Sequence, residues 1–177
     1  MKNKLKNISK FLSLVLRHQP QKIDLKLDAQ GWADTQELID KMPNLTLELL
    51  QEVVSTNAKK RFAFNEDGSK IRASQGHSLS VELGYSPSQP PTILYHGTAT
   101  QHLDAIAIKG LLKMNRQHVH LSENIETATQ VGQRHGKLVL LEVAAEAMQE
   151  AGFLFYLSAN GVWLTDEVPV EYLIFPE

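Results

Sequence analysis

The chain has 177 residues, 42% of them apolar and 21% charged, which is typical of a folded protein with one domain or two small lobes. It contains no cysteine, so disulfides, thiolate metal sites and a cysteine nucleophile are excluded. No apolar run is long enough to span a membrane, and the basic N-terminus lacks the apolar core of a secretory signal. We therefore expect a cytoplasmic protein with no membrane partner.

The charge is unevenly distributed, although the net charge is only −2. Residues 1–137 hold all 18 lysines and arginines and 13 of the 20 acids, whereas the last forty residues hold seven acids and no lysine or arginine. The basic character of residues 1–137 favours a polyanionic partner such as a nucleic acid. A solvated, lysine-rich helix face would explain the same charge.

Three helices are predicted in the first 60 residues. Apolar residues at helical spacing predict a helix from about residue 3 that must end before Pro20. Asp34 followed by Glu37 is typical of a capping box that opens a short helix. A third helix fits residues 46–56.

Two alternating segments follow, residues 61–65 and 69–73, and the Asp67-Gly68 turn between them predicts a β-hairpin. Three helices followed by a hairpin is the element order of a winged helix-turn-helix. Residues 84–91 then combine a glycine with three prolines, which predicts a linker between two lobes.

Short strands dominate the rest of the chain. Two helices interrupt them, at about residues 100–109 and 124–135, and Gly110 and Gly136 are predicted to close these helices. Most connections are too short for parallel crossovers, so we predict an antiparallel sheet and an α+β fold. No glycine-rich dinucleotide motif and no P-loop is present. The predicted strands are residues 92–98, 118–122, 137–144, 152–158, 161–165 and 170–175.

Several cationic side chains are candidates for binding phosphate. Arg17 and His18 would close the first helix, Arg72 leaves the hairpin, and Arg134 would close the helix before Gly136. A guanidinium can donate two parallel hydrogen bonds to a phosphate group. The helix dipole alone also favours a cation at a helix C-terminus, so simple helix caps remain an alternative interpretation.

Histidines gather in the second half of the chain. His118 and His120 alternate on one predicted strand and would share a face, and His96 lies where another strand meets a turn. The three rings could supply zinc ligands, pack in the core, or hydrogen-bond to ribose hydroxyls or a pyrophosphate. Gly97 would let the backbone approach a ligand closely.

Six short segments carry most of these residues. They are LRH (16–18), IRASQGHS (71–78), LYHGT (94–98), RQHVHLS (116–122), the arginine before a glycine at 134–136, and SANGVWLT (158–165). Together and in this order they resemble the KptA-type RNA 2′-phosphotransferases over nearly the whole chain. The resemblance implies a winged-helix, RNA-binding lobe at residues 1–83, a linker at 84–91, and an ADP-ribosyltransferase-like, NAD-binding lobe at 92–177.

The resemblance also implies a reaction. An internal RNA 2′-phosphate attacks the nicotinamide ribose of NAD and expels nicotinamide, and the ribose 2″-hydroxyl then releases the RNA and leaves ADP-ribose 1″,2″-cyclic phosphate. The family's essential Arg-His-Arg-Arg set corresponds to Arg17, His18, Arg72 and Arg134. Arg116 competes with Arg134 for the fourth position. No metal ion is implied.

The resemblance implies that its remaining segments line an NAD cleft. The apolar strand at residues 161–164 stands where many protein-modifying relatives carry a glutamate, which suits a nucleophile that is already an anion. Asn160 is also expected to form a tight turn with Gly161. The predicted NAD-binding residues are His96, Gly97, Thr98, His120, Ser122 and Asn160.

Two other functions remain open from the sequence. A terminal-phosphate ADP-ribosyltransferase would stop after the first step and leave a stable ADP-ribosylated nucleic-acid end. A winged-helix nucleic-acid-binding regulator would only sense a nucleotide with its acidic C-terminal lobe. We expect a monomer that acts on RNA bearing a 2′-phosphate and consumes NAD as co-substrate.

Overall fold

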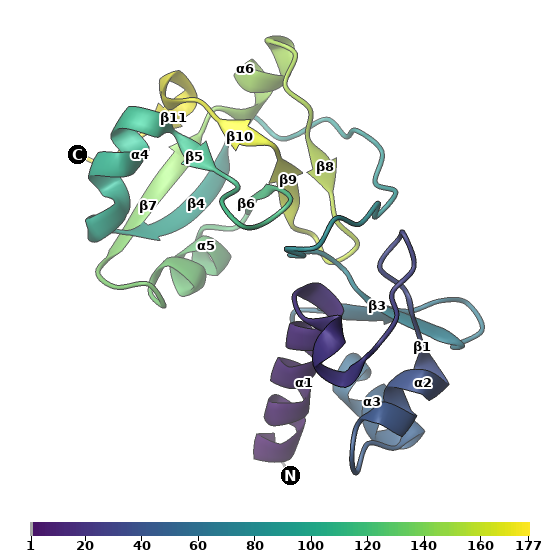
Figure 1. Cartoon of the computed structure of the whole chain (residues 1–177). Coiled ribbons are helices and arrows are strands. Elements are labelled where there is room, and N and C mark those ends of the chain that lie inside the picture. The colour runs from purple at the N-terminus through teal and green to yellow at the C-terminus, as the bar shows by residue number, and fades with distance from the viewer. Residues whose placement is uncertain (1) are drawn as a thin grey trace. The chain divides into compact units, whose positions relative to one another are not determined.

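The computed structural model describes residues 2–177, and the chain forms two compact units, residues 1–84 and 85–177 (Figure 1). Every pair of named strands in the described residues is antiparallel, as the short connections predicted, and the protein is of the α+β class. In this described part of the chain, no helix is both long and apolar enough to cross a lipid bilayer.

Helix α1 (Lys2–Arg17) opens the first unit, as predicted. Its apolar side chains Leu12, Val15 and Leu16 are completely buried, whereas its described lysines are exposed. The chain then turns at Pro20 into a short 3₁₀ helix, η1 (Pro20–Ile23), because proline has no amide hydrogen with which to continue the α-helix.

Side-chain caps fix where the next two helices begin. Asp34 Oδ1 accepts a hydrogen bond of 2.8 Å from the Glu37 amide at the start of α2 (Thr35–Lys41). Thr46 Oγ1 accepts one of 3.2 Å from the third residue of α3 (Leu47–Ser55). Each cap satisfies an amide that lacks a partner within the helix. The predicted helix starts are therefore confirmed.

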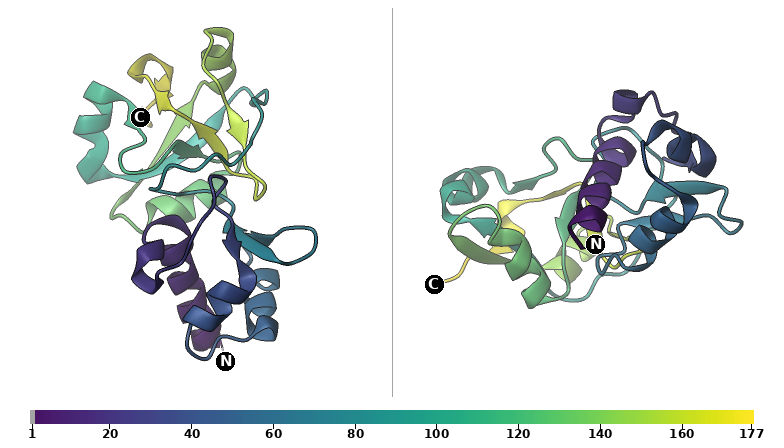
Figure 2. Two further views of the ribbon diagram at one scale, coloured as in Figure 1. Left: turned by 45° about the vertical axis from the view of Figure 1, so that its right-hand side comes forward. Right: turned by 90° about the horizontal axis from the view of Figure 1, so that it is seen from below.

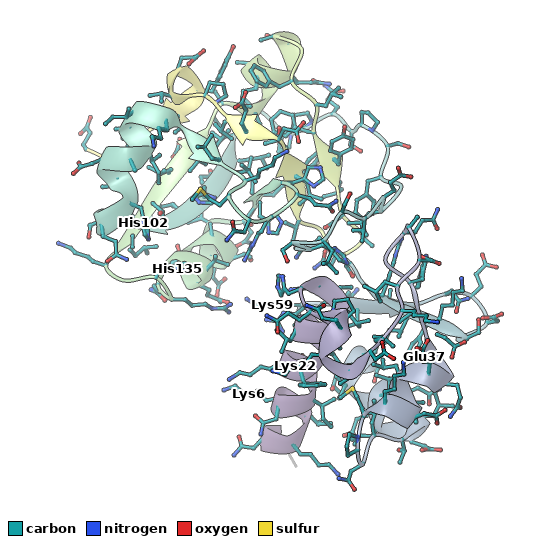
Figure 3. All side chains as sticks on the ribbon, viewed as in Figure 1. Lys6, Lys22, Glu37, Lys59, His102 and His135 are labelled. Carbon is teal, nitrogen blue, oxygen red and sulfur yellow. The ribbon has the colours of Figure 1, made fainter. Side chains whose placement is uncertain are left out.

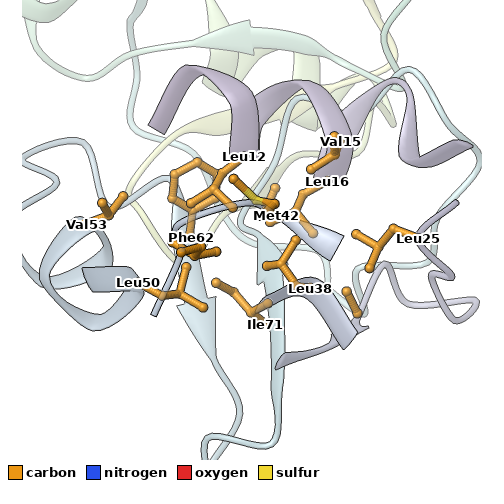
Figure 4. Packing of buried hydrophobic residues seen from close by; sticks show 13 residues of the cluster. Leu12, Val15, Leu16, Leu25, Leu38, Met42, Leu50, Val53, Phe62 and Ile71 are labelled. Atoms are coloured by element: carbon orange, nitrogen blue, oxygen red, sulfur yellow. The ribbon is translucent and has the colours of Figure 1, made fainter. Parts of the chain in front are cut away.

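The first unit also contains a three-stranded antiparallel sheet. Strands β2 (Phe62–Phe64) and β3 (Lys70–Ala73) form the predicted hairpin, and β1 (Ala33–Asp34) pairs with the other edge of β3. Strand β1 has only two residues and was not predicted, because so short a strand has no periodicity. The helices and the sheet enclose one apolar core, shown in Figure 4.

Two small sheets shape the second unit. Strand β4 (Leu94–Ala99) pairs with β7 (Leu138–Val143) over its whole length, and β11 (Leu173–Ile174) continues this sheet. An isolated bridge between Tyr95 and Ser122 connects β4 to the second sheet.

The second sheet has the order β6-β9-β8. Its strands are β6 (Val119–Leu121), β9 (Trp163–Thr165) and β8 (Tyr156–Leu157). A further pair, β5 (Leu111–Leu112) with β10 (Glu167–Val168), was not predicted.

The helices of the second unit differ in part from the prediction. The chain over 100–109 forms η2 (Thr100–His102) and α4 (Leu103–Lys109), and Gly110 ends α4 as predicted, with a φ of 72°. Helix α5 (Ile125–Gly132), which lies against the β4–β7 sheet (Figure 2), ends before Gln133 and not at Gly136. The chain must leave the helix early because Leu138 already pairs with Ala99 in the sheet.

Two predicted strands were too long, and one helix was missed. Only β8 is extended within residues 152–158, and residues 170–175 contain η3 (Val170–Tyr172) before β11. Apolar runs of this length do not distinguish a strand from a buried irregular segment. Helix α6 (Ala145–Glu150) lies between β7 and β8 and was not predicted.

The proline-rich segment at 85–91 is packed along the second unit. Pro87 forms an isolated bridge with Tyr156, and the Ser88 amide donates a 2.8 Å hydrogen bond to the Phe155 carbonyl. The Ala159 amide donates to the Tyr85 hydroxyl at 3.2 Å. These contacts hold the segment beside β8.

Candidate active site

The C-terminal end of α1 is tied to the segment that follows β3. The Ser78 amide donates a 3.0 Å hydrogen bond to the Arg17 carbonyl, and the Ser78 hydroxyl lies 3.0 Å from His18 Nδ1. The second contact fixes the orientation of the His18 ring through its Nδ1 atom. Ser78 therefore holds Arg17 by its carbonyl and His18 by its ring, although it lies 61 and 60 residues further along the chain.

Arg72 extends from β3 and is held by an aromatic ring and by backbone carbonyls. Its guanidinium carbon lies 4.4 Å from the centre of the Trp32 ring, within the range of a cation–π interaction. One guanidinium nitrogen also donates to the carbonyls of Gln30 and Leu83, each at 3.4 Å. These contacts restrict a side chain that would otherwise have many conformations.

His77 lies among these cations. It is completely buried, and in the described part of the chain neither ring nitrogen has a hydrogen-bond partner. Burial and the positive charges of Arg17, His18 and Arg72 lower the pKa of His77 to about 4. Three of the four predicted catalytic residues therefore act electrostatically on one neutral imidazole, which sequence reasoning did not select although IRASQGHS contains it.

Two further histidines meet in the second unit. The Nδ1 atom of His96, on β4, lies 3.0 Å from the His120 carbonyl oxygen on β6. Because a carbonyl can only accept, Nδ1 carries a proton and donates. Burial is the largest influence on this ring and lowers its pKa, with His135 and Arg116 adding to the effect. His96 is therefore neutral near pH 7, and its Nε2 is an acceptor.

The His120 ring has the opposite arrangement. Arg116 Nη1 lies 2.8 Å from His120 Nδ1. A guanidinium has donors only, so Nδ1 of His120 accepts and the ring proton lies on Nε2. One ring thus offers an acceptor and the other a donor, and a hydroxyl group can use both.

Gly97 has a different local role from the one expected. A Cβ atom built on Gly97 would lie 1.9 Å from the Ala128 carbonyl oxygen and 2.9 Å from the Gly132 amide nitrogen. The missing side chain therefore lets α5 pack directly on β4, and this face of Gly97 is occupied by a helix. The adjacent predicted residue, Thr98, is buried in the same strand.

Ser122 and Asn160 both take part in turns. The Ser122 hydroxyl donates to the Asn124 carbonyl and accepts from the Asn124 amide, each at 3.0 Å, just before α5. Asn160 Oδ1 accepts a 2.7 Å hydrogen bond from Ser158, and Gly161 has a φ of 77°. The tight turn predicted at Asn160 is confirmed.

Arg134 lies in the turn after α5, since that helix ends early. Its amide donates to the Val131 carbonyl at 3.2 Å, and its side chain is exposed. The next residue, His135, has its carbonyl bonded by Gln101, which also contacts His102 (Figure 3). Arg116, the other arginine considered for the fourth position, contacts the predicted NAD-binding residue His120.

The zinc alternative gains no support from the geometry. Among residues 2–177, no three histidine, aspartate or glutamate side chains are grouped so that they could hold a metal ion. His96 and His120 direct their Nδ1 atoms to a carbonyl and to a guanidinium, and His118 packs its ring 5.7 Å from that of Tyr156.

These clusters fit an enzyme of the transferase class that handles a phosphorylated substrate. The chain belongs to the RNA 2′-phosphotransferase, Tpt1/KptA family, whose sequence model matches residues 3–167. A relative named "Probable RNA 2′-phosphotransferase" from Flavobacterium johnsoniae is 58% identical over 177 residues, covering 98% of this chain and 97% of the relative. A relative with the same name from Acaryochloris marina is 53% identical, covering 98% of this chain and 98% of the relative. Another from Hahella chejuensis is 54% identical, covering 98% of this chain and 95% of the relative.

Proposed function

We propose that this protein removes an internal 2′-phosphate from RNA and transfers it to NAD, which it consumes. In this proposal the first unit is a winged-helix lobe that binds RNA, and the second is an ADP-ribosyltransferase-like lobe that binds NAD. The observation that carries the proposal is the family match over residues 3–167. The two arginines of the first unit whose charges act on His77, Arg17 and Arg72, support it, because guanidinium groups suit a phosphate dianion.

The first step joins the RNA to ADP-ribose. An oxygen of the 2′-phosphate forms a bond to C1″ of the nicotinamide ribose, the bond from C1″ to the pyridinium nitrogen breaks, and neutral nicotinamide leaves. The nucleophile is already an anion and needs no base, so the enzyme mainly has to hold the two reactants in line. Arg17 and Arg72 would hold the phosphate.

The second step releases the RNA. The 2″-hydroxyl oxygen forms a bond to phosphorus, the bond from phosphorus to the RNA 2′-oxygen breaks, and ADP-ribose 1″,2″-cyclic phosphate results. One proton must pass from the 2″-hydroxyl to the departing oxygen, and His18 can carry it. Arg17, Arg72 and Arg134 would stabilise the charge that builds on the phosphoryl oxygens.

The second unit would bind the NAD ribose and pyrophosphate. The acceptor Nε2 of His96 and the Nε2–H donor of His120 match the donor and acceptor of a ribose hydroxyl. Thr98, Ser122 and Asn160 would complete this site. Gly97 would contribute through its backbone, since its Cα faces α5.

A single assay tests the proposed function. The purified protein is mixed with NAD and an oligoribonucleotide carrying one internal 2′-phosphate, and the products are resolved by mass. We expect dephosphorylated RNA, nicotinamide and ADP-ribose cyclic phosphate in equal amounts. A stable ADP-ribosylated RNA would favour a transferase that stops after the first step, and no NAD turnover at all would overturn the proposal.

A further inference from the structure

We infer that Arg116 is a positioning residue that acts through His120: its guanidinium fixes the His120 tautomer so that Nε2–H is the donor presented by that ring. The inference rests on the proposed function only in taking His120 to contact NAD. Arg116 would then not be the fourth phosphate-binding arginine, and that role would belong to Arg134.

The contact between the two side chains is short and has one chemical interpretation. Arg116 Nη1 and His120 Nδ1 are 2.8 Å apart, within the usual range of an N–H donor and its acceptor. Arginine remains protonated at any pH at which a protein is folded, and it has no acceptor. An imidazolium has no lone pair to accept this bond, so the contact also selects the neutral ring.

The His120 backbone is fixed as well as its side chain. His120 pairs with Leu164 where β6 lies beside β9, and the His120 carbonyl accepts the hydrogen bond from His96 Nδ1. The backbone contacts leave two features of the side chain undetermined, its rotation and the position of the ring proton. Arg116 restricts both, and it comes from the loop that precedes β6, only four residues away.

The His96 and His120 rings together present one acceptor and one donor. The bond from His96 Nδ1–H to the His120 carbonyl leaves an acceptor at Nε2 of His96, whereas Arg116 leaves a donor at Nε2 of His120. If the His120 tautomer changed, both rings would present acceptors at Nε2. Two acceptors cannot both be satisfied by a single hydroxyl proton, so binding of a ribose hydroxyl would weaken.

Three variants of the full chain test this inference. Arg116→Met removes the donor and the charge, Arg116→Gln keeps an N–H donor without the charge, and Lys113→Gln removes a neighbouring cation that pairs with Asp166. The His120 tautomer is measured from the ¹⁵N chemical shifts of its ring without substrate, and KM for NAD and kcat are measured with 2′-phosphorylated RNA.

We expect Arg116→Met to show a mixture of His120 tautomers. Its KM for NAD should rise about tenfold, because the loss of one hydrogen bond weakens binding by about that factor. Across the variants, KM for NAD should follow the fraction of His120 that carries its proton on Nε2. The KM of Arg116→Gln therefore stays near the wild-type value if the glutamine amide keeps the tautomer. Lys113→Gln should match wild type in both measurements. A single Nε2–H tautomer in Arg116→Met, or a raised KM without a change of tautomer, would overturn the inference. Failure of the wild-type protein to consume NAD would instead overturn the proposed function, because the tautomer is measured without turnover.

Discussion

Arg17 and His18 occupy the last turn of α1 and the residue after it, where cations are stabilised by the helix dipole whether or not they act on a substrate. The contacts of Ser78 add a second constraint, because they hold this turn against the segment after β3. A helix cap alone would not need that attachment. It suits residues that must be held still relative to Arg72.

Replacing Arg17 or His18 by alanine is expected to slow the second step more than the first, because charge on phosphorus builds mainly there. Loss of one such group costs about 100- to 1,000-fold in rate. The RNA 2′-phospho-ADP-ribose adduct should then accumulate, which quenched-flow gel analysis would reveal. Gln19→Ala, at the exposed neighbouring residue, serves as the control. Variants that release no nicotinamide and form no adduct would contradict this division of roles.

The buried imidazole of His77 makes the first unit sensitive to acid. Its pKa is about 4 in the folded protein and 6.5 without perturbation, so the unfolded chain binds more protons between these values. Stability contributed by the neutral ring is therefore present above pH 6.5 and is lost as the pH falls to about 4. The full loss is about 3 kcal/mol.

This dependence can be measured by urea unfolding followed through Trp32 fluorescence, in a Trp163→Phe background that removes the signal of the second unit. We expect His77→Phe to flatten the fall in unfolding free energy between pH 6.5 and 4. His102→Gln, which removes an exposed histidine, should leave the fall unchanged. An equally steep fall in His77→Phe would show that other groups cause it.

Element packing in the second unit depends on a glycine contact between α5 and β4. Gly97→Ala would place a methyl group 1.9 Å from a helix carbonyl oxygen, and backbone must move to relieve it. We expect a loss of at least about 3 kcal/mol and a melting temperature of the second unit lowered by more than about 10 °C. Gln130→Ala, at an exposed site on the same helix, should change it little. An unchanged melting temperature would mean that α5 is not packed as described.

Local patterns were sufficient for elements whose signals lie within a few residues. Asp34 and Glu37 predicted a helix start because a cap joins residues three apart. The helix end predicted at Gly136 was wrong, because the end of α5 is decided by the pairing of Leu138 with the distant residue Ala99. The short strand β1 could not be predicted, since it exists only by pairing with β3.

On the scale of the whole molecule, the positive charge is concentrated in the first unit. Lys6, Lys22 and Lys59 project on the α1 side of this unit, whereas Glu37 lies on the α2 side (Figure 3). A polyanion would be attracted to the α1 side, and each phosphate contact adds to the salt dependence of binding.

We therefore expect the double variant Lys6→Gln, Lys22→Gln to bind RNA more weakly and with less salt dependence. Each lost contact should reduce the slope of log affinity against log salt by about 0.7 for a single strand. Fluorescence anisotropy with labelled RNA at several salt concentrations measures this slope. Lys109→Gln in α4 is the control, and an unchanged slope in the double variant would place the RNA elsewhere.

The amino-acid sequence by itself determined the family, the α+β class and most helix starts, because ordered motifs, caps and periodicity are local properties of the chain. It also named Arg17, His18, Arg72 and Arg134 as one set, through the resemblance to the family. Only the tertiary structure decided that the charges of Arg17, His18 and Arg72 act on a buried His77, that Gly97 accommodates a helix, and that Arg116 contacts the His120 ring. Burial and hydrogen bonding between distant residues depend on how the chain folds back on itself, which no local pattern specifies.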